Sequence, residues 1–130
     1  MKFTASTIGH EISAVLHGVD KKLISDSNFL KNIIIDGLKK DNFKIIKEVD
    51  YKFSPQGYTL TVLLSESHVA IHTYPEHGSI YFGLYSCKAK GHGKKMYEHF
   101  VEMLKPKDIV VNMRDVIVKW DEGFFEEPGV

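Results

Sequence analysis

Two helical patterns embedded among short strand-like segments constrain the fold of this chain more than any other feature. Residues 28–40 and 94–104 each repeat apolar side chains at i, i+3 and i+4, the stripe of an amphipathic helix. Asp26 and Ser27 offer caps before the first helix, and Pro106 lies just beyond the end of the second. The stripes consist of Leu30, Ile33, Ile34 and Leu38 in the first helix and Tyr97, Phe100, Val101 and Leu104 in the second.

The remaining ordered segments have the length and composition of strands. Residues 8–19, 44–52, 58–64, 69–73, 79–86 and part of 108–119 fit this pattern, and Pro55 and Gly57 mark a turn over 53–57. The short turns favour an antiparallel sheet. We therefore predict an α+β fold, a two-layer sandwich with both helices packed on one face of the sheet. The other face then needs polar residues or a second copy of the chain.

Size, charge and cysteine content restrict the class of protein. A chain of 130 residues predicts a single domain over 1–130. Its 17 basic residues balance 17 acidic ones and include one arginine, Arg114, so a nucleic-acid partner is not expected. The single Cys87 suggests a reducing compartment, and neither a signal peptide nor a membrane-spanning run is visible. The sequence thus predicts a cytoplasmic protein with no membrane partner.

Reactive side chains are concentrated between residues 65 and 87. His68 and His72 share a strand face but lie about 13 Å apart at about 3.3 Å per residue, so they do not suit one metal ion. We therefore predict no metal site. Cys87 with His72 could make an activated thiolate, although a lone cysteine is more often a small buried apolar residue.

The Glu66–Ser67 bond offers a different chemistry. A serine hydroxyl in a strained turn can attack the carbonyl of the preceding residue and convert the amide to an ester. Elimination would release the upstream chain and leave a pyruvoyl group at the new terminus. Such a ketone forms a Schiff base with an amine substrate and withdraws electrons during decarboxylation. The residues alone do not distinguish this from an ordinary solvent-facing turn.

The run from Leu64 to Glu76, LSESHVAIHTYPE, resembles the self-cleaving segment S-E-S-H-x-x-I-H-T-W-P-E of the prokaryotic S-adenosylmethionine decarboxylases. The turn beginning at Phe53 is similar to the family's F-x-P-x-G, and Cys87 stands where the family has a catalytic cysteine. The resemblance extends over nearly the whole chain. It implies cleavage between Glu66 and Ser67 into residues 1–66 (β chain) and 67–130 (α chain), with a pyruvoyl cofactor derived from Ser67.

The resemblance also assigns roles to other residues. His72 is similar to the histidine that assists processing, with Thr59 in a supporting position, and Cys87 to the acid that returns a proton to the substrate α-carbon. Phe53 is similar to an aromatic residue that stacks on adenine, and Glu76 to a carboxylate that binds substrate. The implied activity is decarboxylation of S-adenosylmethionine to the aminopropyl donor of spermidine biosynthesis.

Ser67 and His72 differ in strand parity and are separated by about 16 Å in an extended strand. We therefore expect a homodimer in which two protomers build each site. Tyr74 replaces the family's tryptophan, and Gly83 stands where an acidic residue is usual, so arginine or ornithine remain alternative substrates. A processing-dead regulatory paralogue is the alternative outside enzymes. We assign the remaining four histidines, His10, His17, His92 and His99, to structural or surface positions, and Trp120, Phe124 and Phe125 to packing.

Overall fold

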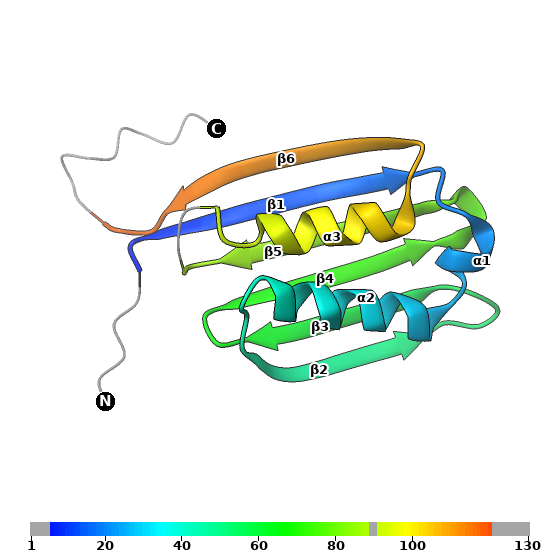
Figure 1. Ribbon diagram of the computed structural model, residues 1–130, viewed down its shortest axis with the longest axis horizontal. Coiled ribbons are helices and arrows are strands. Elements are labelled where there is room, and N and C mark those ends of the chain that lie inside the picture. Colours follow the sequence, from blue (N-terminus) through cyan, green and yellow to red (C-terminus); the bar gives the residue numbers. More distant parts are fainter. Residues whose placement is uncertain (1–5, 89–90, 121–130) are drawn as a thin grey trace.

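The computed structural model describes residues 6–88 and 91–120, and within these ranges six strands form one antiparallel sheet. Their order across the sheet is β2-β3-β4-β5-β1-β6, so that the first strand is enclosed between β5 and β6 (Figure 1). The strands are β1 (Ile8–His17), β2 (Ile45–Lys52), β3 (Tyr58–Leu64), β4 (Ser67–Tyr74), β5 (Ser79–Ser86) and β6 (Asp108–Ile117).

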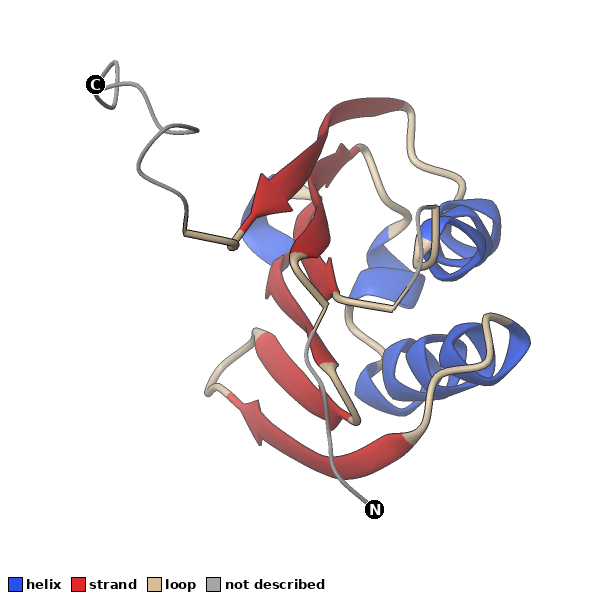
Figure 2. Cartoon of the chain, turned by 90° about the vertical axis from the view of Figure 1, so that its left-hand side faces the viewer, coloured by secondary structure: helices blue, strands red, loops and turns tan. Residues whose placement is uncertain are grey.

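The helices cover one face of this sheet and leave the other face open (Figure 2). The two long helices are α2 (Ser27–Lys40) and α3 (Lys94–Leu104), which lie side by side and run roughly along the strands (Figure 1). A short helix, α1 (Lys21–Ile24), and a 3-10 turn, η1 (Pro75–His77), complete the described elements. The predicted α+β sandwich with both long helices on one face is therefore confirmed.

Local sequence explains where α2 begins and which side it buries. The Asp26 carboxylate accepts a hydrogen bond from the backbone N–H of Phe29 and so satisfies one donor of the first turn. The predicted apolar stripe is the buried face of the helix, and Lys39 and Lys40 occupy the last turn, where the helix dipole favours cations. The capping residue, the apolar stripe and the terminal lysines therefore all agree with the helix that is observed.

The start of α3 depends on a residue from the other long helix. Asp41 ends α2, and its buried carboxylate oxygen Oδ2 accepts hydrogen bonds from the N–H groups of Gly93 (2.9 Å) and Met96 (3.0 Å). These are donors that the first turn of α3 cannot satisfy internally. One carboxylate thus couples the end of α2 to the beginning of α3.

The core lies between the sheet and the helices. Alternate residues of the central strands point into it, as the regular burial patterns of β3, β4 and β5 show. Phe82 of β5 is fully buried and packs its ring against those of Phe100 and Tyr97 of α3, with ring centroids 5.1 and 5.7 Å away. These contacts hold the helical layer on the sheet.

The open face carries apolar side chains that the protomer does not cover. Val49 and Tyr51 of β2, Leu63 of β3 and Tyr74 of β4 are all exposed, between 46% and 63%. Their strand positions place them opposite the helix-facing residues. A surface of this kind is compatible with the expected second copy of the chain.

The structure departs from the sequence-based description in a few places. The short α1 and η1 were not predicted, because four-residue and three-residue helical turns carry too little periodicity to be recognised. Strand β4 begins at Ser67 rather than at residue 69. Trp120 is 73% exposed, and its assignment to packing stays a prediction. Phe124 and Phe125 lie outside the described residues.

Among the helices that the structure describes, none has the length and apolar character needed to span a membrane.

Candidate active site

The Glu66–Ser67 bond lies where a hairpin turn enters a strand. Ser65 and Glu66 connect β3 to β4, and the N–H of Ser65 donates a hydrogen bond to the carbonyl of Lys44 (3.0 Å). Ser67 is the first residue of β4 and is only 8% exposed. Ser67 shares the buried face of β4 with Val69 and Ile71, so its side chain faces the helical layer.

A small cavity of about 180 Å³ adjoins this bond. The turn residues form one side of it, and side chains that follow α2 and β5 form the other. Its lining consists of Phe43, Lys44, Ser65, Glu66, Ser67 and Lys88. The bond predicted to be cleaved is therefore at the surface of the fold, while the serine hydroxyl points inward from it.

Thr59 and His72 form a hydrogen-bonded pair on the opposite, open face. They are cross-strand partners on β3 and β4, and Oγ1 of Thr59 lies 2.9 Å from Nδ1 of His72. The ring of Tyr81 on β5 lies on the other side of His72, with centroids 5.9 Å apart. The structure therefore brings together the two residues predicted to assist processing.

Cys87 follows β5 and is a partly buried free thiol. Its hydrogen bond with Tyr85, followed by burial, raises the pKa of the Tyr85 phenol above its ordinary value. Tyr85 also stacks on His68, with ring centroids 5.9 Å apart on the open face. The backbone of Gly9 makes room for this tyrosine, because a Cβ there would lie 2.2 Å from the phenol oxygen. Cys87 thus lies next to Tyr85, whose ring stacks on His68.

Phe53 and Glu76 come from two loops at one end of the sheet. Gln56 donates a hydrogen bond from Nε2 to Oε2 of Glu76 (3.3 Å), which links the turn after β2 to the turn after β4. Phe53 is 51% exposed and contacts Tyr51 edge to face at 4.8 Å. Phe53 also lines a cavity of about 310 Å³ between the turn after β2 and the connection from α1 to α2. An exposed ring beside a cavity is suited to stacking on a planar ligand.

The predicted site residues therefore form two groups within one protomer. Glu66, Ser67 and Cys87 lie at the end of the sheet where β3 turns into β4, because Ser67 pairs with Ser86. Phe53, Thr59, His72 and Glu76 lie at the opposite end of β4. Five residues of extended strand, about 16 Å, separate Ser67 from His72, and the two side chains point to opposite faces.

A buried polar cluster beside Ser67 escaped the sequence analysis. Ser86, the cross-strand partner of Ser67, is fully buried, and its Oγ lies 3.0 Å from Nδ1 of His92. The ring of His92 packs on Phe43 at 3.9 Å, and its Nε2 bonds to the backbone carbonyl of Asp41. These residues come from three separate segments, so no local pattern could have revealed the cluster.

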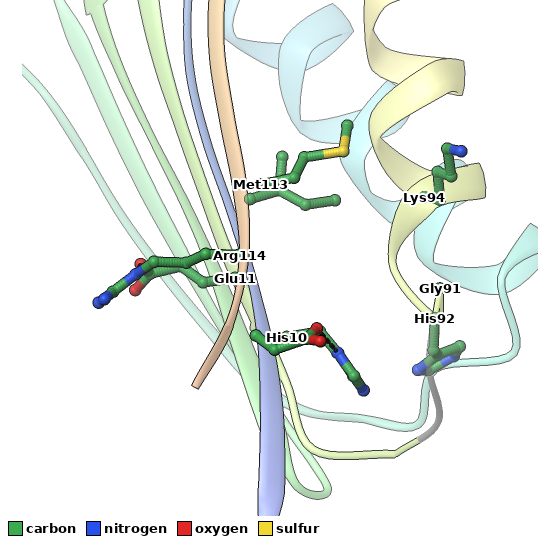
Figure 3. Close-up of a pocket in the computed structure, with 9 residues that line it drawn as sticks. His10, Glu11, Gly91, His92, Lys94, Met113 and Arg114 are labelled. Carbon is green, nitrogen blue, oxygen red and sulfur yellow. Dashed lines mark hydrogen bonds and ion pairs between the residues drawn. The ribbon is translucent and has the colours of Figure 1, made fainter. Parts of the chain in front are cut away.

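The outer side of His92 borders a second cavity, also of about 310 Å³, between α3 and the β1–β6 edge (Figure 3). Met113 faces this space, and His10 hydrogen-bonds to Asp115 at its lower end, with Nδ1 to Oδ1 at 2.8 Å. Glu11 and Arg114 pair on the far side of the strands, with Oε1 to Nε at 2.8 Å. His10 and His92 thus each form hydrogen bonds with other residues of the protomer.

No group of three or more histidine, cysteine or acidic side chains suited to a metal ion occurs in the described part of the chain.

Comparison with known proteins identifies the family. A profile of the S-adenosylmethionine decarboxylase family matches residues 10–115. The S-adenosylmethionine decarboxylase proenzyme of Sulfurihydrogenibium sp. (strain YO3AOP1) is 37% identical over 103 residues, which cover 79% of this chain and 77% of that protein. The proenzyme of Pyrococcus abyssi is 32% identical over 99 residues, covering 76% and 71%.

Solved structures agree with this result. The crystal structure of the adenosylmethionine decarboxylase from Aquifex aeolicus superposes with a TM-score of 0.82 at 30% identity, covering 91% of this chain and 98% of that one. The Trypanosoma brucei AdoMetDC-delta26 monomer shares the fold, with a TM-score of 0.56 at 16% identity, over 78% of this chain and 44% of that one. The chain therefore belongs to the S-adenosylmethionine decarboxylase family, a family of carboxy-lyases.

Proposed function

We propose that this protein cleaves itself between Glu66 and Ser67 and then decarboxylates S-adenosylmethionine. The family match over residues 10–115, with the Glu66–Ser67 bond held at a hairpin turn inside the matched region, is the observation that carries the proposal. The product would be the aminopropyl donor for spermidine biosynthesis. The two chains, 1–66 and 67–130, would stay associated, because β3 and β4 remain paired in the sheet.

A pyruvoyl group fits at position 67. The residue begins a strand, so the chain break leaves the new terminus anchored by the ladder to β5, and a cavity adjoins it on the turn side. When present, this group supplies a ketone that condenses with the substrate amine and withdraws electrons as the carboxylate is lost. Its position at the end of β4 would leave the ketone accessible once Glu66 has separated.

The protein's own residues bind the substrate and move protons. Phe53, exposed beside its cavity, would stack on the adenine ring, and Glu76 would bind the ribose hydroxyls. Cys87 would return a proton to the substrate α-carbon after carbon dioxide leaves. A reducing compartment such as the cytoplasm would keep this thiol available for that transfer.

We further propose that each site is built by two protomers. The group at Ser67 and Cys87 and the group at Phe53, His72 and Glu76 lie at opposite ends of β4, too far apart to act together in one protomer. A homodimer that covers the exposed apolar side chains of the open face would let the two groups of different protomers form one site. His72, held by Thr59, would then assist the elimination step of processing.

Intact-mass spectrometry of the purified protein tests the proposal. We expect two fragments, the second beginning with a pyruvoyl group at position 67, and a single mass for Ser67→Ala. Release of carbon dioxide from S-adenosylmethionine, arginine and ornithine then identifies the substrate, a question that Gly83 raises because an acidic residue is usual there. A parent protein that stays uncleaved after prolonged incubation would contradict the proposal and favour a processing-dead regulatory paralogue.

A further inference from the structure

The Ser67 hydroxyl has an immediate polar neighbour on its own face of the sheet. Ser67 and Ser86 are directly opposite each other on β4 and β5. Both side chains point into the helical layer, because they lie on the same buried face of the sheet as the next pair on that face, Val69 and Leu84. Opposed residues of an antiparallel pair have Cβ atoms about 4.5–5.5 Å apart. The two hydroxyl groups are thus within reach of a hydrogen bond after a rotation about χ1.

Ser86 is itself oriented by His92. Nε2 of His92 lies against the backbone carbonyl of Asp41, which can only accept a hydrogen bond, so Nε2 carries the proton of the neutral ring. Nδ1 then presents a lone pair, and the Ser86 hydroxyl donates to it across 3.0 Å. The backbone N–H of Lys88 also donates to the Ser86 oxygen (3.4 Å), which leaves its second lone pair to accept the hydroxyl proton of Ser67.

The residue Asp41 lies beside the far side of the His92 ring. Its carboxylate oxygen Oδ1 is 3.8 Å from Nε2 of His92. The Asp41 side chain is held in place by the N–H groups of Gly93 and Met96, and Phe43 supports the ring face. A histidine that accepts from a serine and is held through its other nitrogen also occurs in serine hydrolases, although here the backbone carbonyl of Asp41, not its carboxylate, holds that nitrogen.

We propose that Ser86 and His92 form a proton relay for the first step of self-cleavage; this inference rests on the function proposed above. As Ser67 Oγ bonds to the Glu66 carbonyl carbon, its proton passes to Ser86, and the Ser86 proton passes to Nδ1 of His92. The C–N bond then breaks, and the proton returns along the same path to the Ser67 nitrogen. The products are an ester to Oγ and a free amine, with no other reactant consumed.

In this relay, residues on the two faces of the sheet assist different steps of self-cleavage. Ser86 would accept the proton of the reacting oxygen on the helical side after the χ1 rotation, and His92 is a positioning residue that acts through Ser86. His72 lies on the open side, where it cannot reach the Ser67 hydroxyl of its own protomer. Formation of the ester and its elimination therefore depend on different histidines.

The test uses full-length protein made by cell-free synthesis, so that cleavage can be followed from the uncleaved state. Intact mass is recorded over time with and without hydroxylamine, which cleaves an ester but leaves an amide intact. Ser86→Ala removes one buried oxygen, and His92→Asn keeps an acceptor for Ser86 but cannot take up a proton. His99→Gln, on α3 but outside the relay, is the matched control.

We expect Ser86→Ala and His92→Asn to slow cleavage by about 100-fold or more, the usual contribution of a general base. Hydroxylamine should not restore their cleavage, because the ester does not form, whereas His99→Gln should cleave like the parent. Ser86→Thr, which keeps the hydroxyl, should recover most of the rate. If Ser86 and His92 had a purely structural role, their variants would have a lower melting temperature, and Ser86→Thr would not recover the rate of cleavage.

Cleavage of Ser86→Ala at the parental rate would overturn the relay, as would rapid cleavage of either variant by hydroxylamine. Loss of activity in Ser86→Thr with a parental melting temperature would also overturn it. Cleavage of the unsubstituted protein distinguishes this inference from the proposed function. If the unsubstituted protein is not cleaved, the proposed function is refuted. If it is cleaved and the Ser86 and His92 variants are cleaved equally fast, only the relay is refuted.

Discussion

Replacement of Asp41 by alanine tests the coupling between the two long helices. The Asp41 carboxylate is buried and satisfies the N–H groups of Gly93 and Met96 at the start of α3. Its removal leaves two donors without an acceptor beside a buried turn. An unsatisfied buried donor costs about 1–3 kcal/mol, and loss of a helix N-cap costs about 0.5–2 kcal/mol.

These contributions overlap, and removal of a buried charge relieves part of the cost. We expect Asp41→Ala to lower the free energy of unfolding by about 3 kcal/mol. For a domain of this size the melting temperature would fall by about 12 °C. Asp41→Asn, which keeps one acceptor oxygen, should lose about 1 kcal/mol.

Urea denaturation followed by circular dichroism measures this loss. Ser67→Ala is the appropriate background, because it keeps the chain as one uncleaved species, and protein concentration must be constant if the chain dimerises. Asp26→Ala, which removes an exposed cap from α2, is the matched control and should cost less. A loss below about 1 kcal/mol for Asp41→Ala, with an unchanged denaturant slope, would refute the reasoning.

Three further predictions concern the core and two titrating groups. Phe82→Ala should cost about 4 kcal/mol in urea denaturation, because the fully buried ring leaves a cavity; a cost near 1 kcal/mol would contradict this packing. Burial and the Lys40 charge lower the pKa of His99 below 6.5, so the unfolded chain takes up this proton first. Stability should therefore decline as pH falls through 6.5, and His99→Gln should flatten that decline; an identical pH profile would argue against it. The Tyr58 hydroxyl holds the pKa of Asp50 below 3.8, so Tyr58→Phe should raise it in an NMR titration of the carboxyl. The parent's advantage over Tyr58→Phe should persist at neutral pH and vanish as pH falls through the folded pKa of Asp50.

The division of the site between two ends of β4 gives a physical reason for a dimer. A regular strand cannot bring Ser67 and His72 together, because their side chains point to opposite faces and are about 16 Å apart. The parity argument from the sequence is confirmed by the strand as observed. The dimer that it suggests stays a prediction, and sedimentation of the Ser67→Ala protein would test it.

Much of the fold was accessible from the sequence because its signals are local. The stripes of α2 and α3, the turn at Pro55 and Gly57, and the alternation in β3 each reflect one contiguous segment. The missed elements were α1 and η1, which are too short to show a period. The 73% exposure of Trp120 could not be predicted either, because a single aromatic residue has no local pattern that indicates its burial.

The candidate site was also predicted only in part from the sequence. The long motif around Ser67 identified the residues and the family, since it is contiguous and does not depend on the fold. The sequence also determined that Ser67 and His72 occupy opposite strand faces, because side chains alternate along any strand. Only the tertiary structure decided that Ser67 faces the helices, since either face of a strand could have been covered.

The tertiary structure alone also assembled Ser86, His92 and Asp41. Their contacts depend on the register of β4 with β5 and on the packing of α3 against the end of α2. Neither follows from local periodicity, because each joins segments distant in the chain. The sequence by itself therefore determined which bond is the candidate for cleavage, and the packing of the two layers decided which groups surround its hydroxyl.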